Sequence, residues 1–175
     1  ARVVKLDDSF TALDGDPVSI NPPWLFEDAG ANKIGDTYYY SYCTNWRNPD
    51  GAKNACIAYM TSKNPLGPYE YQGIFFNNPG TFFGSYGNNH HSICKLGEDY
   101  YLFYHAEYLS KKMGISAGGY RSTNVDRVAI SADGKIEKVT GTYNGVAQLK
   151  DFDPFKLTEA ETMAWEAGIE TEYVS

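Results

Sequence analysis

Two adjacent acids, Glu27 and Asp28, follow a stretch rich in apolar and aromatic residues. Residues 22–30 read Pro-Pro-Trp-Leu-Phe-Glu-Asp-Ala-Gly, and a strand–turn–strand pattern follows in residues 31–40. A carboxyl group among aromatic side chains is desolvated, which favours its neutral form. General acid catalysis near neutral pH requires such a protonated group. Glu27 is therefore a candidate general acid; the alternative is an ordinary carboxylate at a strand end, facing water.

A repeat with an offset of 62 residues indicates how Glu27 is positioned. Residues 33–39 read Lys-Ile-Gly-Asp-Thr-Tyr-Tyr, and residues 95–101 read Lys-Leu-Gly-Glu-Asp-Tyr-Tyr. Repeats of about this length with four strands each predict β-propeller blades. The strand before each glycine turn is then innermost, and it is preceded by Glu27 in one copy and by Asn-Asn-His-His (residues 88–91) in the next. We expect both copies to direct polar groups at one axial pocket.

Composition favours an all-β fold that binds a neutral ligand. The 175 residues include 15 Tyr, 9 Phe, 3 Trp and 17 Gly, with 42% hydrophobic residues, which is typical of strands and turns. A net charge of −7 disfavours nucleic acid and anionic membranes as partners, whereas a sugar fits. Cys43, Cys56 and Cys94 lie in apolar runs without metal-ligand spacing, so we expect buried free thiols.

The strand and turn signals predict a chain of short antiparallel strands. We expect strands over residues 2–6, 26–34, 38–44, 55–61, 69–76, 125–131 and 135–140. Residues 108–119, with two Lys and three Gly, are expected to form a loop, and residues 132–135 a hairpin turn. Residues 152–155 indicate a boundary that divides the chain into residues 1–155 and 156–175. The sequence shows neither a transmembrane segment nor a signal peptide.

Several of these motifs resemble glycoside hydrolase family 43, in particular its arabinofuranosidases, xylosidases and arabinoxylan arabinofuranohydrolases. The resemblance lies in the order and spacing of residues 24–30, 33–34, 38–42, 67–71 and 88–92. It covers residues 1–150 and implies part of a five-bladed β-propeller, roughly its second half. Residues 159–172 resemble the first strands of a β-sandwich carbohydrate-binding module of family 6, which we expect to begin at residue 156.

The resemblance implies an inverting glycosidase in which Glu27 protonates the leaving oxygen. In such enzymes the acid and the base stand roughly 6.5 to 9.5 Å apart, with the attacking water between them. Arg121 is similar to the family's sugar-contacting arginine; a surface ion pair is the alternative. Trp24 and Phe26 are expected to wall the sugar subsite and Trp46 to extend it, or else to pack between blades.

The resemblance also implies a structural calcium ion. His90 matches the histidine near the propeller axis that contacts the ion or its water shell and borders the substrate. His91 is the adjacent alternative, and a histidine hydrogen-bonded into a polar core is the structural one. Side chains alternate along a strand, so only one of the two should face the channel. Calcium prefers oxygen ligands, which favours contact through water. Glu159 and Glu161 are candidate calcium ligands of the binding module.

The family's base and its tuning Asp do not match any position here, since Asp7, Asp8, Asp14 and Asp16 lie outside the acid motif. We therefore expect a fragment whose missing N-terminal half comes from the parent protein or a companion chain, and no hydrolysis by this part alone. The substrate implied is arabinoxylan or xylan of plant cell walls, and the location extracellular. The alternatives are a non-catalytic carbohydrate-binding propeller fragment and a structural piece that folds only with a partner.

Overall fold

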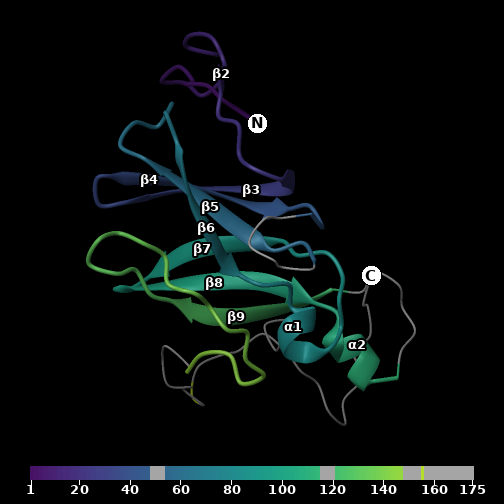
Figure 1. Cartoon of the computed structure of the whole chain (residues 1–175). Helices are drawn as coiled ribbons and strands as arrows, with labels where there is room; N and C mark the ends of the chain where they lie inside the picture. The colour runs from purple at the N-terminus through teal and green to yellow at the C-terminus, as the bar shows by residue number, and fades with distance from the viewer. Residues whose placement is uncertain (48–53, 115–120, 148–154, 156–175) are drawn as a thin grey trace, which may run out of the picture.

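The computed structural model describes residues 1–47, 54–114, 121–147 and 155, and it confirms the all-β prediction for them. Two sheets contain most of the strands, and a small N-terminal hairpin projects away from them (Figure 1). That hairpin pairs β1 (Arg2–Val3) with β2 (Val18–Ser19). Among the described residues, no helix is long and apolar enough to cross a membrane.

The first sheet is a four-stranded antiparallel meander. Its strands follow in sequence order as β3 (Leu25–Ile34), β4 (Thr37–Thr44), β5 (Ile57–Ser62) and β6 (Glu70–Phe76). Successive side chains of a strand point to opposite faces of the sheet, and β4 contributes buried side chains on both faces. Tyr39 packs in the core shared with the second sheet, and Tyr42 packs in a separate cluster on the opposite face.

The second sheet has three antiparallel strands in the described part of the chain. Helix α1 (Gly80–Phe83) leads into β7 (His91–Leu96) and β8 (Asp99–Ala106), and helix α2 (Tyr108–Lys112) precedes β9 (Ser122–Val128). The repeat read from the sequence is confirmed as two equivalent hairpins. Gly35 closes β3–β4 with φ 57°, and Gly97 closes β7–β8 with φ 62°, a left-handed conformation that favours glycine.

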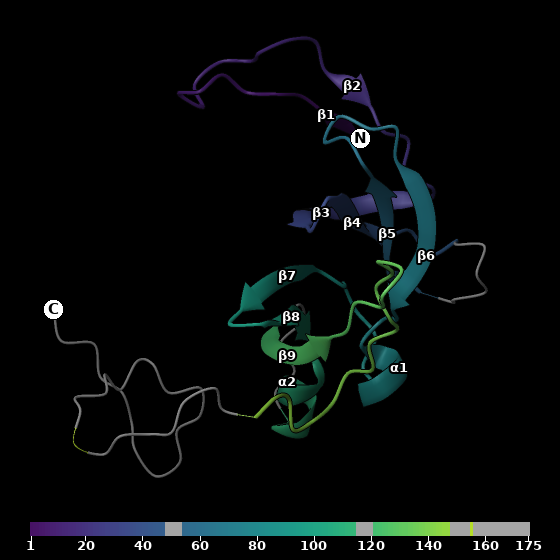
Figure 2. The same cartoon turned by 90° about the vertical axis from the view of Figure 1, so that its left-hand side faces the viewer.

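The first strands of the two sheets, β3 and β7, are neighbours. The Asn32 side-chain amide donates to the Ile93 carbonyl at 3.0 Å and links them. A single hydrophobic core lies between the sheets and includes Phe75, Phe76, Leu102 and Tyr104. Seen from the side, the hairpin and the two sheets follow one another around a curve (Figure 2). The two strands predicted to be innermost in their copies are therefore neighbours.

Several local predictions are wrong. Only Arg2–Val3 of the strand expected over residues 2–6 forms, and the strand expected over residues 125–131 lies three residues earlier, as β9. Residues 135–140 form no named strand: Ile136 makes an isolated bridge to Ile130, and Val139 bridges β6, where its N–H donates to the Phe75 carbonyl. Residues 108–112, expected to be loop, form α2. Cys94 is only partly buried, although Cys43 and Cys56 are buried as expected. The turn at residues 132–135 is confirmed by the hydrogen bond from the Ser131 N–H to the Lys135 carbonyl.

Candidate functional site

A bulge in β3 aims two adjacent acids at the same neighbour. The register against β4 shifts on both sides of Glu27, and Asp28 has φ 60°. In a regular strand, adjacent side chains point to opposite faces; a bulge redirects one of them. Here Glu27 and Asp28 both reach the start of β7, where Glu27 meets His90 and Asp28 meets His91.

Glu27 lies at the seam between the two sheets and is open to solvent. Its Oε1 is 2.7 Å from His90 Nε2, and the Asn88 side-chain amide donates to the same oxygen at 3.4 Å. The Glu27 side chain is 37% exposed, so the expected desolvation by aromatic neighbours is modest. The contact with His90 nevertheless distinguishes Glu27 from an isolated carboxylate facing water.

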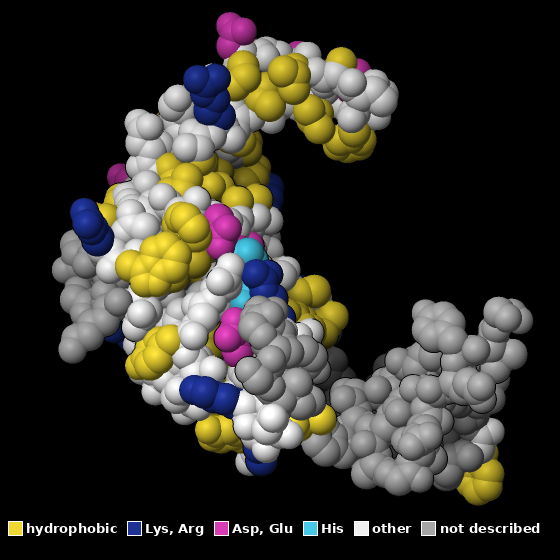
Figure 3. All heavy atoms as spheres, turned by 90° about the vertical axis from the view of Figure 1, so that its right-hand side faces the viewer, with side chains coloured by type: hydrophobic (Ala, Val, Ile, Leu, Met, Phe, Trp, Pro, Cys, Tyr) yellow, Lys and Arg dark blue, Asp and Glu magenta, His cyan; other side chains and the backbone are white. Residues whose placement is uncertain are grey.

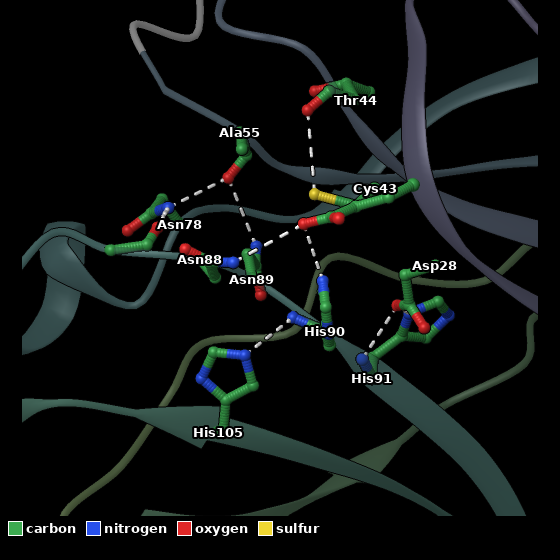
Figure 4. A network of polar contacts seen from close by, with 12 residues as sticks. Asp28, Cys43, Thr44, Ala55, Asn78, Asn88, Asn89, His90, His91 and His105 are labelled. Atoms are coloured by element: carbon green, nitrogen blue, oxygen red, sulfur yellow. Dashed lines mark hydrogen bonds and ion pairs between the residues drawn. The ribbon is translucent and has the colours of Figure 1, made fainter. Parts of the chain in front are cut away.

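Asp28 is held far more firmly than Glu27. Its Oδ2 accepts hydrogen bonds from the backbone N–H of His91 at 2.9 Å and from His91 Nδ1 at 2.6 Å. On the other side of the ring, His91 Nε2 lies 2.7 Å from Ser41 Oγ. Burial acts to raise the pKa of Asp28, but the hydrogen bonds and charge of His91 outweigh it and hold the pKa below its usual value. Figure 4 shows Asp28 and His91 facing each other.

His105 supports His90 from β8. The His90 backbone N–H donates to His105 Nε2 at 3.3 Å (Figure 4). Burial, followed by the positive charge of Arg121, lowers the pKa of His105 to about 4. The ring is therefore neutral at pH 7, and because Nε2 accepts, the proton is on Nδ1. Arg121, His90 and Glu27 thus each lie within electrostatic range of His105.

The aromatic side chains predicted to wall the sugar subsite are partly exposed. Trp24, Phe26 and Trp46 are 38%, 49% and 53% exposed. Phe26 packs edge-on against Trp46 at 5.0 Å, and Trp24 packs against Tyr71 at 6.2 Å. Figure 3 shows hydrophobic side chains gathered beside acidic and histidine side chains on one face. Such half-exposed rings offer apolar faces on which a sugar ring can stack.

No model of a protein family matches the chain, but individual relatives do. The chain is 43% identical over 174 residues to an arabinoxylan arabinofuranohydrolase of Paenibacillus polymyxa and 42% identical over 174 residues to one of Bacillus subtilis; each match covers 98% of the chain. The solved structure of a family 43 arabinoxylan arabinofuranohydrolase from Bacillus subtilis, in complex with cellotetraose, superposes on 94% of the chain with a TM-score of 0.84. The chain is homologous to family 43 glycoside hydrolases.

The homology covers only part of the family 43 relatives. The chain spans 27% of the Paenibacillus polymyxa protein and 34% of the Bacillus subtilis protein, and 34% of the chain in the solved structure. A second solved structure, an α-L-arabinofuranosidase from Clostridium thermocellum, is 28% identical, with a TM-score of 0.64, and matches 84% of this chain and 47% of its own. More than half of each of these proteins thus has no counterpart in these residues.

The calcium ion that the family 43 resemblance implies is not accounted for by these residues alone. The described ranges contain no group of three or more His, Cys, Asp or Glu side chains placed to hold a metal, and His90 Nε2 faces Glu27. Asn89 Oδ1 is a buried oxygen without a hydrogen-bond partner, but one such donor is too few for calcium, which takes six to eight oxygens. Glu159 and Glu161 lie outside the described residues.

Sequence reasoning did not predict the roles of Asp28, His91, Ser41 and His105. Glu27–His90 and Asp28–His91 share the same separation of 63 residues, but the Asp28–His91 contact depends on the β3 bulge, which the sequence does not signal. That separation is one more than the repeat offset, as expected if β3 and β7 meet with a one-residue shift. Ser41 carries no comparable signal, since it lies within a run of tyrosines.

Proposed function

We propose that the protein to which this chain belongs is an inverting glycosidase that removes arabinofuranosyl groups from arabinoxylan, with Glu27 as the general acid. The observation that supports this role is the 2.7 Å contact between Glu27 Oε1 and His90 Nε2 on a solvent-open seam. Because the two groups share this contact, they can hold one proton between them. The second Glu27 oxygen is then free to approach the leaving oxygen of the substrate.

In the proposed reaction, water attacks the anomeric carbon while the glycosidic C–O bond breaks. Glu27 gives its proton to the departing oxygen, and a general base takes the proton of the water. Asp28 is unsuited to be that base, because its Oδ2 is occupied by two hydrogen bonds from His91. We therefore expect the base to come from a part of the protein beyond these residues, as in a complete propeller. We also expect the complete protein to be secreted, because its polysaccharide substrate is outside the cell.

The other predicted residues serve the substrate. In this proposal Arg121 contacts sugar hydroxyls beside the acid, because its planar fork of donors suits paired oxygens. Trp24 and Phe26 wall the sugar subsite, which Trp46 extends.

A bound calcium ion stays a prediction. In this proposal His90 reaches the ion through water, and other parts of the protein supply most of the ligands. A thermal melt with and without a chelator tests it: an unchanged transition counts against a bound ion.

Substitution Glu27→Gln in the complete protein tests the general acid. Removing the proton donor should lower kcat on arabinoxylan by about 10²- to 10⁴-fold. An aryl arabinofuranoside with a good leaving group should lose much less, because its leaving oxygen needs little protonation. Glu98→Gln is the matched control: it makes the same chemical change at a side chain that is 97% exposed on the β7–β8 turn. Full activity of Glu27→Gln on arabinoxylan would refute the assignment.

The second candidate function is carbohydrate binding without catalysis, which the exposed Trp24, Phe26 and Trp46 rings favour. It predicts that the complete protein binds arabinoxylan oligosaccharides, that alanine substitution of these rings weakens binding, and that no sugar is released. Isothermal titration combined with product analysis separates the two candidates. Release of arabinose that depends on Glu27 would exclude the binding-only function.

A further inference from the structure

Two parallel acid–histidine contacts cross the β3–β7 seam side by side. Glu27 pairs with His90 and Asp28 with His91, and both pairs are 63 residues apart in sequence. Glu27 and Asp28 share a peptide bond, as do His90 and His91. The geometry of one pair therefore constrains the geometry of the other within the length of one residue.

The Asp28–His91 pair is the rigid one. The His91 side chain is fully buried, with 0% exposure, and the Phe75 ring packs edge-on against it at 6.0 Å. Asp28 Oδ2 accepts both the backbone and the ring N–H of His91, and His91 Nε2 contacts Ser41 Oγ. By contrast, Glu27 and His90 have a single short contact and stand open to solvent.

Gly30, which has no side chain, leaves room for the buried contact between His91 and Ser41. A Cβ on Gly30 would lie 2.7 Å from Ser41 Oγ and 3.5 Å from His91 Nε2. The first distance is too short for any real Cβ contact, so a larger residue would push the serine and the histidine apart. A side chain at position 30 would thus compete for the space that Ser41 and His91 occupy.

The order Asp–His–Ser has the form of a nucleophile relay, but burial excludes that chemistry. Ser41 is fully buried and accepts or donates its hydrogen bond inside the core. No sugar carbon can approach its oxygen. The relay therefore acts on its neighbours in the chain rather than on a substrate.

We propose that the buried Asp28–His91–Ser41 relay is a positioning device that holds Glu27 and His90 at the distance needed for proton delivery. This rests on the proposed role of Glu27. Asp28 binds the main chain of His91 as well as its ring, so the relay fixes the first residue of β7 against the β3 bulge. His90 and Glu27, one residue earlier on each strand, take their separation from that anchor.

Substitutions Asp28→Asn and Ser41→Ala in the complete protein test the relay. Misplacing a catalytic group by about 1 Å costs up to about 10²-fold in rate, so we expect kcat on arabinoxylan to fall by roughly 10- to 100-fold with little change in KM. The rate on an aryl arabinofuranoside with a good leaving group should change little. The ratio of the two rates in one preparation does not depend on how much protein is folded. Asp36→Asn, on the exposed β3–β4 turn, is the matched control.

The outcomes separate this inference from the proposed function. An equal loss on both substrates, or no loss, in Asp28→Asn would overturn the positioning role while Glu27→Gln still supports the general acid. Full activity of Glu27→Gln on arabinoxylan would overturn both. If neither relay variant is soluble, nitrogen NMR of the unmodified protein decides: the His91 ring should carry its proton on Nδ1, and a neutral ring protonated only on Nε2 would overturn the relay.

Discussion

Glu27 and Asp28 are chemically almost alike and adjacent in sequence, yet their surroundings give them different capacities. Asp28 accepts two hydrogen bonds from His91 and is largely buried. Hydrogen bonds to the charged form stabilise a carboxylate, so Asp28 is a permanent anion at neutral pH. Among the described residues, no hydrogen bond to the second Glu27 oxygen is found, and the Glu27 side chain stands open to solvent. Of the two carboxyl groups, Glu27 is the more exposed to solvent.

The cysteines make a prediction at the same scale. Cys43 is 1% exposed, and burial raises the pKa of its thiol to about 12; Cys56 is 2% exposed. Because the thiolate is the reactive species, both should resist iodoacetamide at pH 8 while the protein is folded. Cys94, which is partly buried, should react first. Peptide mass spectrometry of the alkylated protein measures the three rates separately.

The variant Cys94→Ser provides the control for this labelling. It should remove the early label and leave Cys43 and Cys56 protected until the protein is unfolded in denaturant. Alkylation of Cys43 in the native protein, at a rate like that of Cys94, would contradict the packing of β4 against the core.

At the scale of elements, the sequence was most informative where local chemistry decides the conformation. Gly35 and Gly97 both need positive φ, and each marks a hairpin that the repeat had already indicated. Residues 135–140 alternate like a strand but make only isolated bridges, because tertiary contacts decide whether such a run finds a partner. Helix α2 was missed because glycines follow it closely in sequence and suggest a loop.

The candidate site could be predicted from the sequence only where it depends on the repeat. Glu27 lies near the start of β3 and His90 immediately precedes β7, so the repeat places both at the same end of equivalent strands. The bulge at Asp28, with φ 60°, has no sequence signature, since non-glycine residues rarely adopt that conformation. Without it, Asp28 would point away from Glu27, and the contact with His91 could not be inferred. The sequence likewise did not predict that His105 accepts a hydrogen bond from the His90 N–H, because this contact depends on the pairing of β8 with β7.

A buried carboxylate fastens residues 142–145 to the second sheet. Asp126 on β9 accepts hydrogen bonds from Tyr104 Oη at 2.7 Å, from the Thr142 N–H at 3.0 Å and from Thr142 Oγ1 at 2.6 Å. Substitution Asp126→Ala leaves these donors without an acceptor. We expect it to lower the free energy of unfolding by about 2–4 kcal/mol, measured by denaturant titration.

Asp99→Ala is the control for Asp126→Ala. Asp99 forms a surface ion pair with Arg127 next to the same strands, and such pairs contribute about 0–1 kcal/mol. A loss at Asp126 no larger than that at Asp99 would show that the carboxylate does not anchor residues 142–145.

At the scale of the whole molecule, the two sheets are joined by a common core as well as by the polar seam. Side chains from β4, β5 and β6 pack in one cluster with side chains from β7, β8 and β9. If the polar contacts at the seam were the only link, the two sheets could move relative to each other, because water reaches Glu27 and His90 and can replace their contact. The shared core removes that freedom, so the distance between Glu27 and His90 is set by packing on both sides.

Phe76 is the side chain with which to test this coupling. It is fully buried on β6 and contacts Tyr104 of β8 with ring centroids 4.6 Å apart. Phe76→Ala should lower the free energy of unfolding by about 3–5 kcal/mol. If the sheets share one core, hydrogen exchange of the β5 and β8 amides should accelerate together. Phe10→Ala, at a ring that is 79% exposed on the N-terminal hairpin, should change neither. Faster exchange in β5 with β8 unaffected would mean that the sheets open independently, and the seam that carries Glu27 would then be a flexible joint.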